Sequence, residues 1–350
     1  MKVLELFSGI GGMRCGLTEA LPNEELEFIS VDVNEFCNKV YEESFGNGPL
    51  SLDICGISLD WFTNLGADVW TMSPPCQPYS RQGKGLGSKD ERAAPLHHLI
   101  GILGQLENLP KLIIVENVKN FEESDSFQEL KKVLETLNYD LFGYLLNPLY
   151  MGFPNSRLRF FLVAKLGSDS SIPVPFKILC NDPVYAEFDR IDTNRLRNPI
   201  SDFLCQGHDD VTLRVPDSVL DKPAAFALDV VTRESLQCLC FTRSYRKYIN
   251  GTGSVLLESK SNLVECLDEK FRPKFVHLKS MNELRGCLRY FCPLEAARLN
   301  GFHVNASDAR WTLKFKDSCK GGIQYYRAVG NSLNPHVVAF LVKRHWSRPS

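Results

Sequence analysis

The sequence lacks a long hydrophobic run and a paired-cysteine motif. None of its 350 residues belongs to an uninterrupted apolar stretch of about 18 residues, the length that a membrane-spanning helix needs. The first residues, Met1–Phe7, lack the long apolar core and the cleavage site of a signal peptide. Twelve cysteines are present without any Cys-x-x-Cys pair, so we expect reduced thiols and no metal site. We therefore expect an intracellular, monomeric protein without membrane contact, in the cytoplasm with the nucleus as a second location.

The net charge is also small, but it is unevenly distributed. The formal net charge is −2, yet residues 1–80 carry 3 Lys and Arg against 12 Asp and Glu. Residues 241–350 carry 19 Lys and Arg against 8 Asp and Glu. A basic half of this kind can follow a phosphate backbone, and ordinary solvated faces explain it as well.

The first 165 residues alternate short apolar runs with helix-like segments. The runs expected as strands are Val3–Phe7, Phe28–Val33, Ala67–Met72, Leu112–Asn117 and Arg159–Ala164. Strands that alternate with helices in this way predict an α/β fold with a doubly wound, mostly parallel sheet.

The pattern changes after Lys165. Residues 166–285 mix Ser, Pro, Asp and short apolar pieces without a helical period, which indicates a smaller, irregular domain. Helical patterns return at Pro293–Leu299 and Val337–Arg344. We expect these helices to pack on the first domain, so that residues 1–165 and 286–350 form one domain and 166–285 an insertion.

A glycine-rich segment, Phe7–Gly12, lies where the first strand passes into a helix. Glycine there lets the backbone approach a ligand closely, although a structural turn is an equally good explanation. Asp32 ends the next strand, where an acid commonly accepts ribose hydroxyls, and Asp53 could bind an adenine amino group. Each aspartate could instead cap a helix or lie in a solvated loop. A nucleoside cofactor without a phosphate cradle fits S-adenosylmethionine.

The most specific local signal is Ser73–Pro78, in which Cys76 directly follows two prolines. A cysteine that follows a strand and a diproline lies at the carboxyl edge of the sheet, where such folds bind ligands. The charged, glycine-rich run Arg81–Arg92 could form a lid over it. A buried cysteine on a tight turn is the alternative.

Two further motifs belong to the same predicted edge. Glu116 ends an apolar strand, and a carboxylate with a raised pKa there can protonate a ring nitrogen. Alternation places Arg157 and Arg159 on one face of a strand, aimed at a base carbonyl or a phosphate. Either arginine could instead be a surface ion-pair partner.

In this order, and followed by Gly330-Asn331-Ser332-Leu333, these motifs resemble the cytosine-5 methyltransferase family over nearly the whole chain. The resemblance implies a Rossmann-like, S-adenosylmethionine-dependent methyltransferase fold in which 166–285 is the target-recognition domain. It implies that Cys76 attacks carbon 6 of cytosine, that Glu116 stabilises the protonated ring nitrogen, and that Arg159 with Arg157 orients the carbonyl oxygen. The implied cofactor pocket comprises Phe7, Gly9, Ile10, Gly11, Gly12, Asp32, Val33, Asp53, Ile54, Ser73, Asn331 and Ser332.

Within that family, Cys240-Phe241-Thr242 resembles the signature of the branch that methylates cytosine 38 of aspartate tRNA. The branch implies tRNA as substrate, with weaker binding of DNA, and one departure is Asn155 where the family usually has Gln. The residues expected to contact the nucleic acid are Arg81, Lys84, Cys240, Thr242, Arg243, Arg246 and Lys247. Tyr245 and Tyr248 lie among them, either as stacking platforms or as core residues. The alternatives are a DNA cytosine-5 methyltransferase and a non-catalytic nucleic-acid-binding protein of the same fold.

Overall fold

A computed structural model describes most of the chain, and its packing divides the chain into two compact units. The described residues are 1–75, 91–167, 175–193, 196–206, 210–258, 264–268, 273–275, 280–307, 309–315 and 322–346. The first unit comprises Met1–Asn147, Leu158–Asp192 and Pro335–Ser350. The second comprises Pro148–Arg157 and Thr193–Asn334.

The first unit is built on an eight-stranded sheet with the order β2-β1-β3-β4-β7-β5-β8-β9. Strands β1 to β4 are parallel, whereas β7 runs antiparallel to both of its neighbours, β4 and β5. The strands are β1 (Lys2–Leu6), β2 (Glu27–Val31), β3 (Val69–Met72), β4 (Leu112–Val118), β5 (Tyr139–Leu146), β7 (Arg159–Leu166), β8 (Ile178–Cys180) and β9 (Asp189–Arg190). The carboxyl ends of β1 to β4 therefore lie at one edge, where an open α/β sheet binds its ligands.

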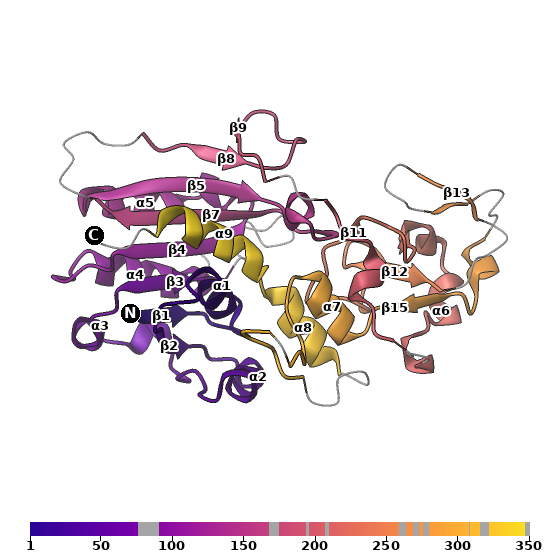
Figure 1. The fold of residues 1–350 in the computed structure, drawn as a ribbon, viewed down its shortest axis with the longest axis horizontal. Helices are drawn as coiled ribbons and strands as arrows, with labels where there is room; N and C mark the ends of the chain where they lie inside the picture. The colour runs from indigo at the N-terminus through magenta and orange to yellow at the C-terminus, as the bar shows by residue number, and fades with distance from the viewer. Residues whose placement is uncertain are drawn as a thin grey trace. The chain divides into compact units, whose positions relative to one another are not determined.

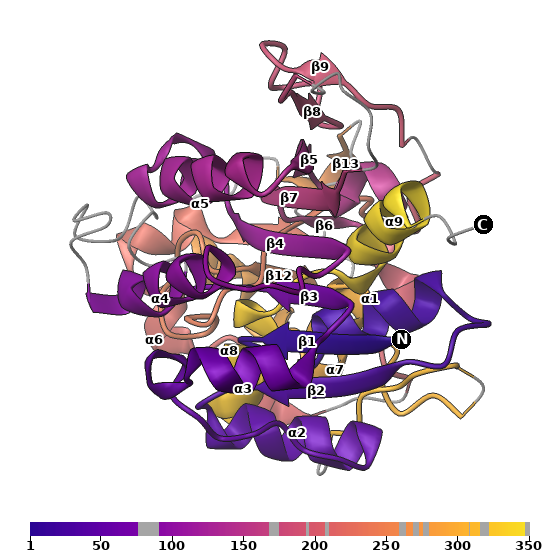
Figure 2. The ribbon, with the colours of Figure 1, turned by 90° about the vertical axis from the view of Figure 1, so that its left-hand side faces the viewer.

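Helices cover both faces of this sheet, as Figure 2 shows: α4 and α5 lie on one face, and α1 and α9 pair on the other. The helices are α1 (Gly12–Ala20), α2 (Glu35–Phe45), α3 (Leu59–Leu65), α4 (Ala94–Leu103), α5 (Asp125–Thr136) and α9 (Pro335–His345). Among the described residues, no helix combines the length and the apolar character needed to cross a bilayer.

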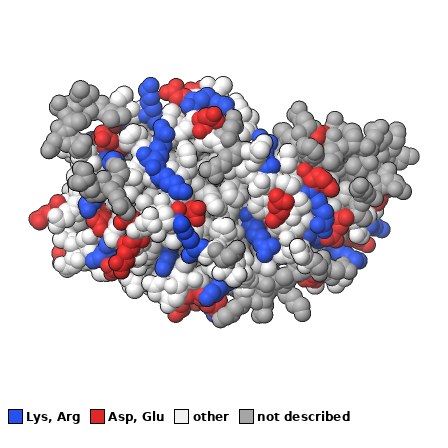
Figure 3. Space-filling view, in the orientation of Figure 1, with Lys and Arg blue, Asp and Glu red and all other residues white. Residues whose placement is uncertain are grey.

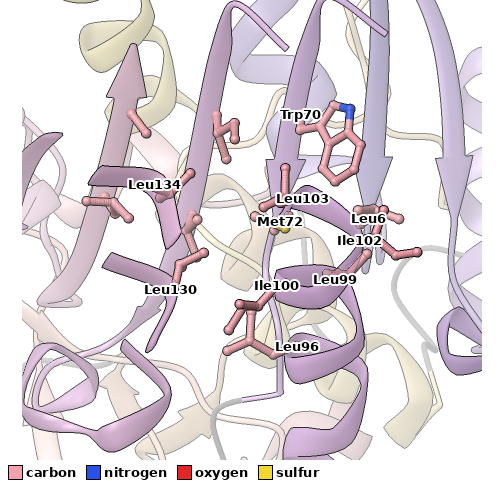
Figure 4. Packing of buried hydrophobic residues seen from close by; sticks show 14 of the residues in the cluster. Leu6, Trp70, Met72, Leu96, Leu99, Ile100, Ile102, Leu103, Leu130 and Leu134 are labelled. Carbon is pink, nitrogen blue, oxygen red and sulfur yellow. The ribbon is translucent and has the colours of Figure 1, made fainter. Parts of the chain in front are cut away.

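The core of this unit fills the space between the sheet and α4 and α5. Leu6 and Met72 from the strands pack with Leu99 and Leu103 of α4 and with Leu130 of α5, all of them buried (Figure 4). A strand covered on both faces must be apolar on both sides, which explains the continuous apolar run at the start of β4.

A carboxylate is buried on the opposite face of the sheet, beside α1 and α2. Glu5 of β1 is fully buried, and its carboxylate accepts hydrogen bonds from the Ser30 hydroxyl (3.0 Å), the Tyr41 hydroxyl (2.7 Å) and the backbone N–H of Arg14 (3.0 Å). The carboxylate thus joins β1 to β2, α2 and the first turn of α1. Burial, the dominant cause, raises the pKa of Glu5 to about 7, against the lowering effect of these hydrogen bonds.

The second unit consists of short strands and short helices (Figure 1). Its strands are β6 (Asn155–Ser156), β10 (Asp229–Val231), β11 (Cys238–Leu239), β12 (Ser254–Leu257), β13 (Val264–Leu267), β14 (Pro273–Phe275) and β15 (Leu288–Tyr290). Its helices are α6 (Asp217–Leu220), α7 (Pro293–Leu299) and α8 (Ile323–Asn331). Strands β10, β12 and β15 form one sheet, and β6 pairs with β11.

The five predicted strands are present, shifted at their ends by at most two residues. Sequence analysis missed β5, because its run YDLFGYLL contains few β-branched residues and a central glycine. Pro293–Leu299 forms α7, which lies in the second unit and packs there on α8 and on the 3-10 turn Ile200–Phe203. The two units are defined by compactness, whereas the predicted domains are defined by function. The predicted domain boundaries therefore stay a prediction.

The buried carboxylate leads to a prediction about stability. Because folding raises the pKa of Glu5 from 4.5 to about 7, its contribution to stability is fully present below pH 4.5 and is lost as the pH rises through 7. Relative to Glu5→Gln, the free energy of unfolding of the wild type should therefore fall by about 3 kcal/mol over that range. Urea unfolding between pH 4 and pH 8 measures this difference. The exposed Glu27→Gln change in the same sheet should keep the wild-type pH dependence; equal slopes for wild type and Glu5→Gln would contradict the prediction.

Candidate active site

The glycine-rich segment forms a strained turn between β1 and α1. Phe7 has φ +56°, Gly9 φ +52° and Gly11 φ +85°, in the left-handed region that disfavours side chains. A Cβ at Gly11 would also lie 2.5 Å from the Phe45 ring, so glycine is required there on both counts. Ile10 is buried in the core and Gly12 begins α1. The glycines of the turn therefore leave its backbone open to a ligand.

Asp32 fixes this turn to the end of β2. One carboxylate oxygen accepts the N–H of Gly9 and the other accepts the N–H of Asn34, both at 2.8 Å. Burial raises the pKa of Asp32, while hydrogen bonds from the backbone N–H groups of Asn34, Gly9 and Val33 act in the opposite direction. Each oxygen keeps a further lone pair, so acceptance of ribose hydroxyls stays a prediction that the geometry allows.

The other predicted cofactor residues of the first unit lie at the same strand ends. Val33 follows Asp32 and is 67% exposed, which is unusual for a large apolar side chain. Asp53 is exposed and caps a 3-10 turn by accepting the N–H of Cys55 at 3.0 Å. Ile54 is a core residue, and the N–H of Ser73 bonds the carbonyl of Leu6 at the end of β1.

These residues fit a nucleoside cofactor. The Ser8 hydroxyl in the glycine turn is buried and has no hydrogen-bond partner among the described residues, so a polar group of a ligand would satisfy it. The exposed Val33 offers an apolar surface for a purine ring beside the carboxylate of Asp32.

Glu116 and Arg159 form an ion pair at the ends of adjacent strands. Arg159 begins β7 and Glu116 lies near the end of β4, and Arg159 Nε lies 3.4 Å from Glu116 Oε1. Both side chains are mostly buried, exposed by 20% and 11% respectively. The pair is thus partly shielded from water, and this shielding strengthens the attraction between the two charges.

Asn117 connects this pair to the diproline segment. Its Nδ2 donates to the carbonyl of Pro74 at 3.2 Å, so the ends of β3 and β4 are held together. Sequence analysis quoted Asn117 within a motif without giving it a role; its place beside Glu116 at a strand end was the available signal. Cys76, Arg81 and Lys84 lie outside the described residues, and their predicted roles stay predictions.

Arg157 has a different environment from Arg159. The prediction that both lie on one face of one strand was wrong, because β7 begins only at Arg159 and Arg157 belongs to the second unit. Its buried guanidinium donates to Cys240 Sγ (3.0 Å), to the carbonyl of Gly330 (3.3 Å) and to the carbonyl of Ser332. Arg157 therefore holds together two motifs that are far apart in the sequence.

Backbone contact reinforces this connection. A Cβ on Gly330 would lie 2.2 Å from the backbone of Thr242 and Arg243, so only glycine permits the approach. Asn331, which ends α8, is exposed, and Ser332 is half-buried. Nearby, Asn155 Nδ2 donates to Asn300 Oδ1 at 3.2 Å. Asn155, whose side chain is shorter than the Gln usual in the family, therefore still has a buried hydrogen-bond partner.

The arginines and the lysine predicted to contact nucleic acid in the second unit differ in their contacts with other residues of the protein. Arg243, Arg246 and Lys247 are all exposed, and Arg246 also lies over the rings of Tyr290 and Tyr326 and donates to the carbonyl of Thr212. Figure 3 shows basic and acidic side chains interspersed over this unit on the face drawn, rather than one basic field.

The two tyrosines have separate roles. Tyr245 is 1% exposed and donates to the carbonyl of Ser254, so it is a core residue and not a stacking platform. Tyr248 is 58% exposed, and Lys247 Nζ lies 5.2 Å from the centroid of its ring.

The fold and the strand-end site define the class: a Rossmann-like methyltransferase of the S-adenosylmethionine-dependent kind. The family model for C-5 cytosine-specific DNA methylase matches residues 1–347. The chain belongs to this family, which implies S-adenosylmethionine as methyl donor.

Similar proteins cover the full length of the chain. It is 33% identical to human tRNA (cytosine(38)-C(5))-methyltransferase over 98% of both chains. It is 32% identical to the Schizosaccharomyces pombe protein of the same name, over 98% of this chain and 96% of that one. Among solved structures, the Entamoeba histolytica methyltransferase EhMeth matches with a TM-score of 0.77 and 30% identity, over 98% of this chain and 97% of that one.

The contact at Gly330 gives a test of the second unit's packing. Gly330→Ala should push Thr242 and Arg243 away from α8 and destabilise the protein by about 1–3 kcal/mol, the usual cost of overpacking. Gly322→Ala is the matched control, because a Cβ there meets nothing within 4 Å at the other end of the same helix. Chemical denaturation of both variants measures the effect; equal stability of the two would contradict it.

Proposed function

We propose that this protein transfers a methyl group to carbon 5 of a cytosine in tRNA, at position 38 in the anticodon loop of aspartate tRNA. The Glu116–Arg159 pair beside the diproline segment is the observation that carries the chemistry. The choice of tRNA is supported by full-length similarity to relatives named as tRNA cytosine-38 methyltransferases and by Cys240-Phe241-Thr242.

In this proposal Cys76 begins the reaction. Its thiolate adds to carbon 6 of cytosine, which interrupts the aromatic ring and makes carbon 5 nucleophilic. S-Adenosylmethionine, held by the glycine turn and Asp32, would supply the methyl group that carbon 5 takes up. Loss of the carbon-5 proton and elimination of the Cys76 thiol then restore the ring.

Glu116 and Arg159 assist by binding the base. The Glu116 carboxyl hydrogen-bonds the ring nitrogen that gains a proton when the thiolate adds. Arg159 holds Glu116 in place through their ion pair and has further N–H donors for the base carbonyl. Arg157 supports the site indirectly in this scheme, since its donors bind Cys240 and the Gly330–Ser332 backbone.

The backbone of the glycine turn and the carboxylate of Asp32 would hold the cofactor's polar groups, and Val33 its purine. Ile10 and Ile54 are core residues, so any contact from them would come from their backbone.

A loop substrate suits these features. Chemistry on a base requires that it leave the stack, which is easiest in an unpaired loop. The exposed Lys247 and Tyr248 offer a charge and an aromatic face to splayed nucleotides.

The nucleophile and the substrate can be tested together. Cys76→Ala should abolish transfer of labelled methyl groups to tRNA, because alanine has no thiolate to form the proposed carbon-6 adduct. Cys55→Ala, a change at an exposed thiol, should leave the transfer rate unchanged. Undiminished transfer by Cys76→Ala would exclude Cys76 as the nucleophile.

The family's description names DNA, and this favours duplex DNA as the second candidate substrate. Parallel assays on tRNA and duplex DNA decide between them, and preferential labelling of DNA would exclude our choice. Absence of labelling on either, with binding retained, would indicate the non-catalytic alternative.

Binding of tRNA should weaken steeply with salt, because contacts with phosphate release counterions. Lys247→Ala should reduce the slope of log affinity against log salt by about 1. Lys222→Ala, at another exposed lysine of the same unit, serves as the control and should not change the slope. Filter binding over a salt series measures both, and a salt-independent affinity would contradict the prediction.

A further inference from the structure

The second unit contains a pair of thiols in contact that the proposed methyl transfer does not use. Cys205 Sγ and Cys292 Sγ are 3.8 Å apart, although 87 positions separate them in the sequence. Cys292 is fully buried at the start of α7, and Cys205 is half-buried just after the 3-10 turn Ile200–Phe203. A disulfide needs a sulfur separation of about 2.05 Å, so a small side-chain movement suffices to form one.

Charged groups surround the pair. Arg298 of α7 directs a guanidinium nitrogen at Cys205 Sγ at 3.7 Å. Glu295 lies close to both sulfurs, but its carboxylate accepts the N–H groups of Cys205 (3.1 Å) and Cys292 (2.9 Å) and two hydrogen bonds from Arg289. Because the Glu295 oxygens are engaged in this way, the cluster is better suited to thiol chemistry than to binding a metal ion.

The two thiols are not equivalent. The hydrogen bond from Cys292 lowers the pKa of Cys205, assisted by the charges of Arg298 and Arg289 and opposed by burial and Glu295. The same hydrogen bond, together with burial, raises the pKa of Cys292. Cys205, the more exposed of the two, is therefore the one that carries the thiolate, which is the form that reacts with oxidants.

We propose that Cys205 is a site of oxidation by hydrogen peroxide and that Cys292 resolves the product as a disulfide. The Cys205 thiolate attacks one peroxide oxygen, the O–O bond breaks, and hydroxide leaves, which gives a sulfenic acid. Cys292 sulfur then attacks the Cys205 sulfur; the Cys292 proton and the sulfenic hydroxyl leave as water. Two thiols are oxidised to one disulfide and one peroxide is reduced to two waters.

The bond would close a loop of 87 residues within the second unit. A cross-link of this kind restricts the unfolded chain, so the oxidised protein should melt at a higher temperature than the reduced one. The proposal is independent of the proposed function, because neither thiol takes part in the methyl-transfer scheme.

The experiment treats the reduced, full-length protein with graded hydrogen peroxide, blocks remaining thiols with N-ethylmaleimide, and maps peptides by mass spectrometry without reduction. We expect a peptide pair joined through Cys205 and Cys292, two hydrogens lighter than the reduced pair and separated by dithiothreitol. Cys205 should also alkylate roughly tenfold faster at neutral pH than Cys287, a half-buried thiol of the same unit.

Variants separate the two steps. In Cys292→Ser, a cyclic 1,3-diketone should trap the sulfenic acid at Cys205, and no cross-link should form. In Cys205→Ser, Cys292 should remain unoxidised, whereas Cys287→Ser should form the cross-link as the wild type does. Oxidation of Cys205 to sulfinic acid in the wild type with Cys292 intact, or a cross-link to another cysteine, would overturn the proposal.

Discussion

The first unit depends on one buried carboxylate. Glu5 lies on β1, next to the edge strand β2, and its oxygens reach β2 through Ser30, α2 through Tyr41 and α1 through the N–H of Arg14. The first N–H groups of a helix have no partner within the helix, so Glu5 satisfies one of them and sets where α1 begins. The glycine turn spans the short stretch between these two fixed points. Its strained dihedral angles persist because both of its ends are held.

The second unit has a comparable point of attachment in Arg157. Its guanidinium offers several donors in a fixed plane, and here they satisfy a thiol and two carbonyls from separate segments. Cys240 is thereby tied to the loop after α8, and Gly330 adds backbone contact to the same connection. In each unit one polar side chain, Glu5 or Arg157, bonds several separate segments and so fixes their relative positions. Apolar packing then positions the remaining segments of that unit.

The sequence predicted the elements better than the contacts. The strands could be found because strands buried on both faces are continuously apolar, and the strand ends located Asp32 and Glu116. Strand β5 was missed because it contains few β-branched residues and a central glycine. Arg157 was misplaced because the alternation of side chains was assumed to continue through a break in the strand. The burial of Tyr245 could not be read from its basic neighbours, since it depends on contacts with Phe241, Tyr290 and Tyr326. Contacts between distant segments leave no local pattern, and these contacts decide what each site residue does.

The cysteines illustrate the same limit. Their spacing contains no Cys-x-x-Cys motif, but reactivity is a property of environment rather than of spacing. Burial raises the pKa of Cys37 to about 12, with Asp32 acting in the same direction, and burial also raises the pKa of Cys15, so both behave as small apolar core residues. Cys240 is occupied as an acceptor for Arg157, whereas Cys205 has a neighbouring thiol as donor and a guanidinium nearby. A diproline after a strand, together with the motifs that follow it in order, predicts Cys76 as the nucleophile from the sequence. Nothing local distinguishes Cys205, because its partner is brought to it only when α7 packs on the turn Ile200–Phe203.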